Sequence, residues 1–136
     1  MNTGGSVLLD TNIVVAHFRN DIDLTAQLRS ASAQYLPWIV LGELSYGASL
    51  NGARRAQRRE AQMALIRDFL QTATLLLPDQ STSEQYGEVK AEPAGMGKPI
   101  PDNDIWIVAI ARQFDLPLVT RDRHFAAVPR LTMLAW

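Results

Sequence analysis

The chain has 136 residues, of which 47% are hydrophobic and 20% are charged, and its formal net charge is −1. This length suits one domain with its own core, so we expect residues 1–136 to form a single domain. The hydrophobic fraction excludes a disordered chain, and the absence of cysteine excludes a disulfide framework, a thiolate zinc site and a cysteine nucleophile. The 13 Lys and Arg residues against 14 Asp and Glu residues argue against a protein that coats nucleic acid by bulk charge.

The sequence shows no signal for export or for membrane insertion. Residues 1–6 lack the basic segment and the cleavage pattern of a secretory signal. The longest apolar stretch, Ile105 to Ala111, is far shorter than the roughly 18 residues that span a bilayer. We therefore expect a cytoplasmic protein without a membrane partner.

Short apolar runs alternate with longer segments of helical periodicity along the chain. The runs that predict strands span residues 7–9, 34–36, 73–77, 118–120 and 131–134. The segments that predict helices span residues 13–18, 21–32, 37–48, 53–72, 81–92 and 105–114, with a helical turn over 122–127. The run over 105–114 has the periodicity of a strand as much as of a helix, but the acidic residues before it and its continuation to Arg112 favour a buried helix.

Cap residues mark the beginnings of three of these helices. Asp10 to Asn12 offer N-cap side chains to the first helix, and Pro37 suits the first position of the third. Asp102 or Asn103 can cap the helix over 105–114. Because strands that alternate with helices form parallel sheets covered by helices, we expect an α/β fold, an α/β/α sandwich with a central parallel sheet of about five short strands.

Four acidic residues fall where burial is expected. Asp10 and Asp122 each follow a short apolar strand, and ligands of parallel sheets bind at the carboxyl ends of strands. If those two strands are neighbours, about 4.8 Å separates them and the carboxylates can meet. Glu43 interrupts the apolar face of its helix, and Asp104 opens a helix that is otherwise apolar.

Carboxylates gathered in this way need a compensating charge. They repel one another, and an unpaired buried charge is costly. Mg²⁺ takes oxygen ligands, usually one or two carboxylates together with water and a substrate phosphate. Such ions supply a water nucleophile and stabilise the attacking and leaving oxygens of a phosphodiester. The arrangement therefore indicates metal-dependent phosphodiester chemistry.

Four motifs carry these acids in order along the chain. They are VLLDTN at residues 7–12, GELSYGA at 42–48, PDNDIWIVA at 101–109 and LVTRDRHF at 118–125. Together they resemble the PIN-domain ribonucleases, and more narrowly the VapC toxins of bacterial type II toxin–antitoxin systems. The resemblance covers nearly the whole chain. It implies a Mg²⁺- or Mn²⁺-dependent endoribonuclease that is a homodimer, is inhibited by a cognate antitoxin protein and reaches DNA only through that antitoxin.

The resemblance also implies roles for individual residues. Asp10 and Asp104 correspond to the principal metal ligands, and Asp122 completes the acidic group. Glu43 corresponds to a residue that orients water or shapes a second metal position. Three supporting positions hold the acids or the substrate phosphate by hydrogen bonds; they are Thr11, Asn12 and Thr120.

Two departures from the family pattern leave the acids untouched. Pro93 and Gly95 shorten the helix before the third motif, which can alter the rim of the cleft. Asp115 stands where many relatives place a helix-ending glycine, and aspartate tolerates the left-handed conformation required there.

Several of these residues also have a purely structural interpretation. Asp10 by itself is more often an N-cap than a ligand, and Asp122 by itself is an ordinary surface acid. Glu43 has the weakest structural interpretation, because the neighbouring sequence offers it no partner. The two histidines, His17 and His124, lack ligand spacing, and we interpret both as packing or solvent-exposed residues.

Two further questions stay open. The basic cluster of Arg54, Arg55, Arg58 and Arg59 is either a solvated helix face or a docking site for RNA phosphates or for the antitoxin. The alternative function is a catalytically weak PIN-like scaffold that mainly binds an antitoxin in a DNA-binding complex, although the presence of all four acids argues against it.

The net charge is compatible with an RNA substrate after all. If four of the 14 acids line one metal cleft, ten remain outside it against 13 Lys and Arg residues. The exterior is then modestly basic. The identity of the RNA is not encoded in any of these motifs.

Overall fold

The computed structural model describes residues 5–20, 24–50, 55–92 and 100–136. Its centre is a sheet of five parallel strands in the order β3-β2-β1-β4-β5. The strands are β1 (Val7–Leu9), β2 (Gln34–Pro37), β3 (Ala73–Leu76), β4 (Leu118–Val119) and β5 (Met133–Leu134). Each coincides with a predicted strand, so the prediction of a parallel sheet of about five short strands is confirmed.

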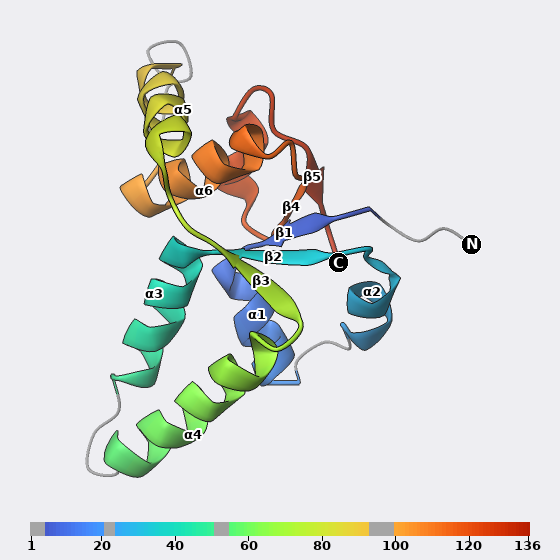
Figure 1. The fold of residues 1–136 in the computed structure, drawn as a ribbon, viewed down its shortest axis with the longest axis vertical. Coiled ribbons are helices and arrows are strands. Elements are labelled where there is room, and N and C mark those ends of the chain that lie inside the picture. Colours follow the sequence, from blue (N-terminus) through green and yellow to red (C-terminus); the bar gives the residue numbers. More distant parts are fainter. Residues whose placement is uncertain (1–4, 21–23, 51–54, 93–99) are drawn as a thin grey trace.

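Helices cover both faces of this sheet (Figure 1). On one face lie α1 (Thr11–Phe18), α2 (Thr25–Ser30), α3 (Trp38–Ala48) and α4 (Arg55–Phe69), and on the other lie α5 (Gln80–Ala91) and α6 (Asp102–Gln113). A short 3-10 helix, η2 (Arg123–Ala127), follows β4. The predicted α/β/α sandwich is therefore confirmed.

The most enclosed elements of the core are β1 and α6. Every residue of β1 is at most 2% exposed. In α6, Ile105 and all residues from Ile107 to Ala111 are buried. A helix enclosed on nearly every side carries apolar residues all round, and for this reason its sequence lacks a one-sided apolar stripe. The prediction of a buried helix rather than a strand here is confirmed.

Two proline residues set helix beginnings differently from the prediction. Pro37 pairs with Leu76 of β3 and is the extended N-cap of α3, so it ends a strand instead of opening a helix. Pro101 is the extended N-cap of α6 and makes no side-chain cap bond. The prediction that Asp102 or Asn103 caps this helix is therefore wrong. Both lie in its first turn, because the extended backbone at Pro101 allows the helix to begin earlier, where acidic side chains suit the positive end of the helix dipole.

Some predicted features lie outside the described residues. They include residues 21–23 of the second predicted helix, residues 53–54 of the fourth, and Pro93 and Gly95. In the part of the chain that the structure describes, no helix is long and apolar enough to cross a membrane.

Candidate metal and active site

The sheet order reverses at β1, because β2 and β3 lie on one side of it while β4 and β5 lie on the other. Leu9 of β1 is in register with Val119 of β4, and the Asp10 amide donates to the Val119 carbonyl at 3.1 Å. In parallel sheets, ligands bind at the carboxyl ends of strands beside such a reversal. The strands that precede Asp10 and Asp122 are therefore neighbours. This adjacency is the condition under which the two carboxylates were expected to meet.

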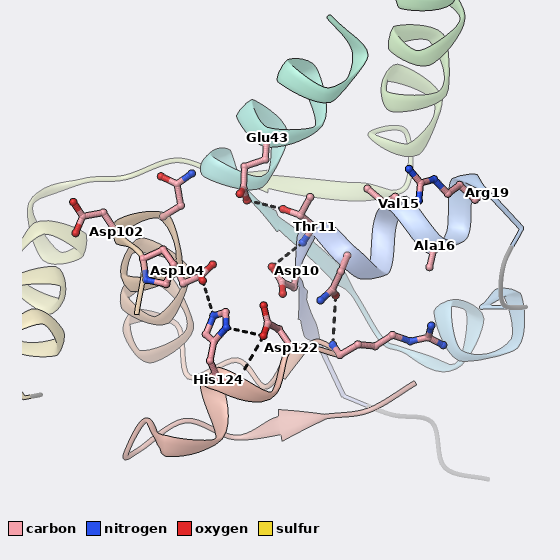
Figure 2. A pocket seen from close by; sticks show the side chains of 14 residues that line it. Asp10, Thr11, Val15, Ala16, Arg19, Glu43, Asp102, Asp104, Asp122 and His124 are labelled. Carbon is pink, nitrogen blue, oxygen red and sulfur yellow. Dashed lines mark hydrogen bonds and ion pairs between the residues drawn. The ribbon is translucent and has the colours of Figure 1, made fainter. Parts of the chain in front are cut away.

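A pocket of about 800 Å³ opens at this edge of the sheet (Figure 2). All four predicted acids, Asp10, Glu43, Asp104 and Asp122, line this acidic pocket. They come from the end of β1, from α3, from the first turn of α6 and from the turn after β4. Segments that lie far apart in the sequence thus bring their carboxylates to one cavity.

Asp10 combines a structural role with its place in the site. It is only 5% exposed, and it is the N-cap of α1. Its Oδ1 accepts the Thr11 amide at 2.8 Å, and its Oδ2 accepts the Thr120 hydroxyl at 2.6 Å. Burial raises the pKa of Asp10 above its ordinary value, although these two hydrogen bonds oppose the rise. The prediction that Asp10 is an N-cap is therefore confirmed, and the same side chain also lines the acidic pocket.

Glu43 faces the acidic pocket from the middle of α3, where it is partly buried. Its Oε1 accepts the Thr11 hydroxyl at 2.6 Å. The partner that the neighbouring sequence lacked thus comes from α1. Because the amide of Thr11 holds Asp10 and its hydroxyl holds Glu43, one residue orients two of the acids.

Asp104 lies in the first turn of α6 with its side chain 15% exposed. Burial raises the pKa of its carboxyl, and the charges of Asp10 and Glu43 add to the rise, whereas the hydrogen bond from His124 opposes it. Asp104 is therefore electrostatically coupled to the acids of β1 and α3.

His124 is the site residue that sequence reasoning missed. Its Nε2 lies 2.6 Å from Asp104 Oδ2, and its Nδ1 lies 2.6 Å from Asp122 Oδ1 (Figure 2). The interpretation of His124 as a packing or solvent residue is wrong, because η2 turns its ring into the acidic pocket. The available signal was its place two residues after a strand-end acid. His17, in contrast, packs against Phe69, with ring centroids 5.8 Å apart.

The supporting residues Thr120 and Asn12 join the turn after β4 to the start of α1. Thr120 is 3% exposed, and its hydroxyl, which donates to Asp10, also accepts the Asp122 amide at 3.0 Å. Asn12 Oδ1 accepts the Arg121 amide at 3.4 Å. The backbone that carries Asp122 is thereby held beside Asp10.

Cationic side chains lie at the rim of the acidic pocket. Arg19 and Arg121 line it together with the acids. Asp102, which the sequence analysis did not single out as a site residue, also lines it, but its carboxylate pairs with Lys90 at 3.2 Å. Asp102 therefore pairs with a lysine, whereas none of the four predicted acids pairs with a lysine or arginine among the described residues.

The basic cluster of the sequence analysis is only partly within the described residues. Arg54 lies outside them, and the side chain of Arg55 is not described. Arg58 lines a groove of about 490 Å³ between α1, α3 and α4 that it shares with Arg19 and Glu43, and Arg59 is exposed. One member of the cluster thus lies beside the acidic pocket.

The donor set of the acidic pocket fits a hard divalent cation. Within the described ranges, Asp10, Glu43, Asp104 and Asp122 have no ion pair with lysine or arginine. Carboxylate oxygens are the ligands that Mg²⁺ and Mn²⁺ take. Because burial already penalises the charges of Asp10 and Asp104, a bound cation would offset that penalty.

A family model of the PIN domain matches residues 7–131. The match includes strands β1 to β4 and all four acids, and it ends before β5. The chain therefore belongs to the PIN-domain family.

Two curated relatives indicate which type of PIN-domain protein this chain is. Ribonuclease VapC2 of Haemophilus influenzae is 33% identical over 132 residues, which cover 95% of this chain and 96% of that protein. The tRNA(fMet)-specific endonuclease VapC of Shigella flexneri is 29% identical over 135 residues, with 95% and 96% covered. Within the PIN-domain family, the chain is thus of the VapC type.

A solved structure shows the same fold. A chain of the DNA-bound VapBC complex from Salmonella typhimurium superposes with a TM-score of 0.85 at 26% identity, and the match covers 100% of this chain and 99% of that one. The PIN-like fold predicted from the sequence is therefore confirmed.

Proposed function

We propose that this chain is a Mg²⁺- or Mn²⁺-dependent endoribonuclease and the toxin of a type II toxin–antitoxin system. The observation that carries the proposal is the convergence of Asp10, Glu43, Asp104 and Asp122 on one pocket without a lysine or arginine partner in the described part of the chain. The relatives named as ribonucleases support RNA as the substrate class.

In this proposal the four acids have different roles in binding the ion. Asp10 and Asp104 are its principal ligands, and Glu43 and Asp122 complete the acidic group around it. When bound, the divalent ion supplies a water nucleophile and stabilises the charge that develops on the scissile phosphodiester. Thr11 and Thr120 fix the carboxylates by hydrogen bonds of 2.6 to 2.8 Å, so that they do not have to reorient during the reaction.

Arg19 and Arg121 are suited to contact RNA phosphates next to the acids. Both line the acidic pocket, and neither pairs with an acidic side chain among the residues that the structure describes. The Arg121 guanidinium donates a hydrogen bond of 3.4 Å to the Trp136 carbonyl. Arginine binds phosphate oxygens by charge-assisted hydrogen bonds. The pocket thus offers cations to the RNA backbone and carboxylates to the metal.

The proposed protein partners are a cognate antitoxin and a second copy of this chain. The similar structure from Salmonella typhimurium is a VapBC complex bound to DNA, which supports an antitoxin partner and a DNA-bound complex. We propose that this chain reaches DNA only through the antitoxin. The alternative, a catalytically weak scaffold, would have the same partners. It would differ only in that its acids catalyse little or no RNA cleavage.

Cleavage of an RNA pool by the purified chain tests the proposal. We expect cleavage with Mn²⁺ or Mg²⁺, none with EDTA, and none with the Asp10→Asn or Asp104→Asn variant. Asp68→Asn, which changes an exposed acid on α4, should cleave like the wild type. If the wild type left the RNA intact in Mn²⁺ while it still bound an antitoxin without metal, the scaffold would be the better description.

A further inference from the structure

The imidazole of His124 is held between two carboxylates at the mouth of the acidic pocket. Its Nε2 lies 2.6 Å from Asp104 Oδ2, and its Nδ1 lies 2.6 Å from Asp122 Oδ1. Ligand atoms of these three residues all lie within 4.8 Å of one another. The ring also packs against Phe125, with centroids 4.7 Å apart, which restricts its rotation. Both ring nitrogens therefore have fixed directions.

We propose that His124 is a metal ligand through Nε2, alongside Asp104, and that Asp122 orients the imidazole instead of binding the ion itself. This inference rests on the divalent-ion site of the proposed function and changes its ligand set from oxygen alone to oxygen and nitrogen.

The hydrogen bonds distinguish the two ring nitrogens. Asp122 is the N-cap of η2, and its Oδ1 accepts the His124 amide at 3.4 Å as well as contacting Nδ1. It is thus committed to its own turn. Metal-ligating histidines usually donate the second ring N–H to such a carboxylate, which fixes the tautomer and the ring orientation. Nδ1 is the nitrogen in this supporting contact. Nε2 lies against Asp104 Oδ2, and we infer that it exchanges this hydrogen bond for an ion that both atoms bind.

Asp104 connects Nε2 to the other acids. Asp10, Asp104 and His124 line the same pocket, so an ion held by Asp10 and Asp104 would lie in the cavity that the His124 side chain also lines. Two ligand atoms about 2.1 Å from one ion and at right angles to each other are about 3 Å apart. When the ion binds, the proton between Nε2 and Asp104 Oδ2 is released to solvent, and the 2.6 Å between the two atoms widens by a few tenths of an ångström.

A nitrogen ligand changes which ion the site prefers. Mg²⁺ favours carboxylates and water, whereas imidazole suits first-row transition metals. We therefore expect Mn²⁺ to bind more tightly than Mg²⁺, and we expect this preference to depend on His124.

Pulsed electron paramagnetic resonance of the Mn²⁺-loaded chain, recorded without RNA, tests the assignment. The wild type should show coupling between Mn²⁺ and the ¹⁴N of one imidazole, and His124→Gln should abolish it. His17→Gln is the matched control, because the chain has two histidines and His17 lies in α1 against Phe69, away from the acidic pocket. The control should keep the coupling unchanged.

Isothermal titration provides the second readout. His124→Gln should weaken Mn²⁺ binding by about tenfold or more while it changes Mg²⁺ binding by less than about threefold. Thermal unfolding of the variants in EDTA shows whether each is folded before its metal affinity is compared.

The outcomes separate this inference from the proposed function. Mn²⁺ binding without ¹⁴N coupling in the wild type, or coupling that persists in His124→Gln, would overturn the assignment of His124 and leave the ribonuclease intact. Coupling in a wild type that cleaves no RNA would support the ligand and overturn the ribonuclease. A wild type that binds no Mn²⁺ would overturn both.

Discussion

Thr120 is the single hydroxyl on which two of the acids depend. It donates to Asp10 Oδ2 at 2.6 Å and accepts the Asp122 amide at 3.0 Å, and it is 3% exposed. We predict that Thr120→Val, which keeps the shape but removes both bonds, weakens divalent-ion binding by about 10- to 100-fold, as the loss of other groups that orient metal ligands does. Titration calorimetry with Mn²⁺ measures this loss.

The matched control for Thr120→Val is Thr74→Val, because Thr74 is an exposed threonine on β3. Its ion affinity should equal that of the wild type. Equal affinities for both variants would show that the hydroxyl of Thr120 does not orient Asp10.

The raised pKa values of Asp10 and Asp104 make the metal-free protein sensitive to pH. Burial raises both pKa values above the ordinary 3.8, so the folded state binds these protons more tightly than the unfolded chain does. Their contribution to the free energy of unfolding therefore increases as the pH falls from neutral through the raised pKa values, and it becomes constant below about 3.8. Above the raised values, both ionised acids destabilise the fold.

Asp10→Asn isolates this effect. In EDTA at neutral pH, the variant should have a higher free energy of unfolding than the wild type, and the difference should shrink as the pH falls toward 4. Urea unfolding at a series of pH values measures it. Groups that do not interact with Asp10 cancel in the comparison, whereas removal of the Asp10 charge also lowers the pKa of Asp104 and so adds to the difference. A difference that grows as the pH falls would contradict the raised pKa of Asp10.

Sequence reasoning identified the acids more readily than the groups that hold them. Glu43 interrupts an apolar helix face, and the other three acids stand at the ends of apolar segments, which is visible without coordinates; they are Asp10, Asp104 and Asp122. His124 does not interrupt any pattern, and its role depends on how η2 turns its ring toward α6. The partner of Glu43 likewise lies 32 positions away, on another helix.

At the scale of elements, Asp115 ends α6 in a left-handed conformation, with φ 52°. The Leu116 amide donates to Ala111 and the Asp115 amide to Arg112, which is the Schellman pattern of helix termination. The left-handed conformation expected of Asp115 from the sequence is therefore confirmed. This left-handed conformation favours glycine, because in any other residue the Cβ atom comes too close to the backbone.

We predict that the free energy of unfolding decreases in the order Gly, Asp, Ala for the residue at position 115. Asp115→Gly should raise the free energy of unfolding by about 0.5 kcal/mol, since relief of the left-handed strain exceeds the added freedom of the unfolded chain. Asp115→Ala should lower it by about 0.5–1 kcal/mol. Chemical denaturation measures both, and a stabilising alanine would contradict the role of the backbone conformation.

Arg112 of α6 forms a buried ion pair with Glu92 at the end of α5. Two contacts of 2.7 Å join the guanidinium to the carboxylate, and the side chains are 5% and 20% exposed. The guanidinium of Arg112 is the main cause that lowers the pKa of Glu92 below its ordinary value. This pair fixes the two helices of one face of the sheet against each other.

Removal of Glu92 should destabilise the fold strongly. Glu92→Ala leaves the Arg112 charge buried without its carboxylate, so we expect a loss of about 3 kcal/mol in the free energy of unfolding. Glu88→Ala is the control, because its contact with Arg130 is 4.0 Å long and exposed, and it should change stability by less than about 0.5 kcal/mol. Similar losses for both variants would contradict a special role of the buried pair.

The elements themselves were predictable because their signals are local. Apolar runs and caps lie within a few residues of each other, as for β1 and α1. The beginning of α6 was not, because the extended backbone of Pro101 sets it and no side-chain cap takes part. Pro37 was predicted to open a helix because its pairing with Leu76 joins distant segments of the chain and so leaves no signal in the local sequence.

On the scale of the whole molecule, the strand order determines which charged side chains meet in the acidic pocket. Alternation of strands and helices predicts a parallel sheet but not its order, because pairing joins segments that are distant in the chain. The order β3-β2-β1-β4-β5 places the reversal beside β1 and so brings Asp10 next to the turn that carries Asp122. The net charge alone argued against a nucleic-acid partner. The fold, however, gathers the four acids in one pocket that Arg19 and Arg121 also line.

The ends left on cleaved RNA provide the most direct test of a metal-dependent hydrolysis at these carboxylates. In the proposed mechanism water is the nucleophile, so we predict that one new end carries a linear phosphomonoester and the other a hydroxyl, with no 2′,3′-cyclic phosphate, and that EDTA stops the reaction. Cyclic phosphate ends, or cleavage that continues in EDTA, would contradict this mechanism, because the 2′-hydroxyl of the RNA would then be the nucleophile without any need for the ion.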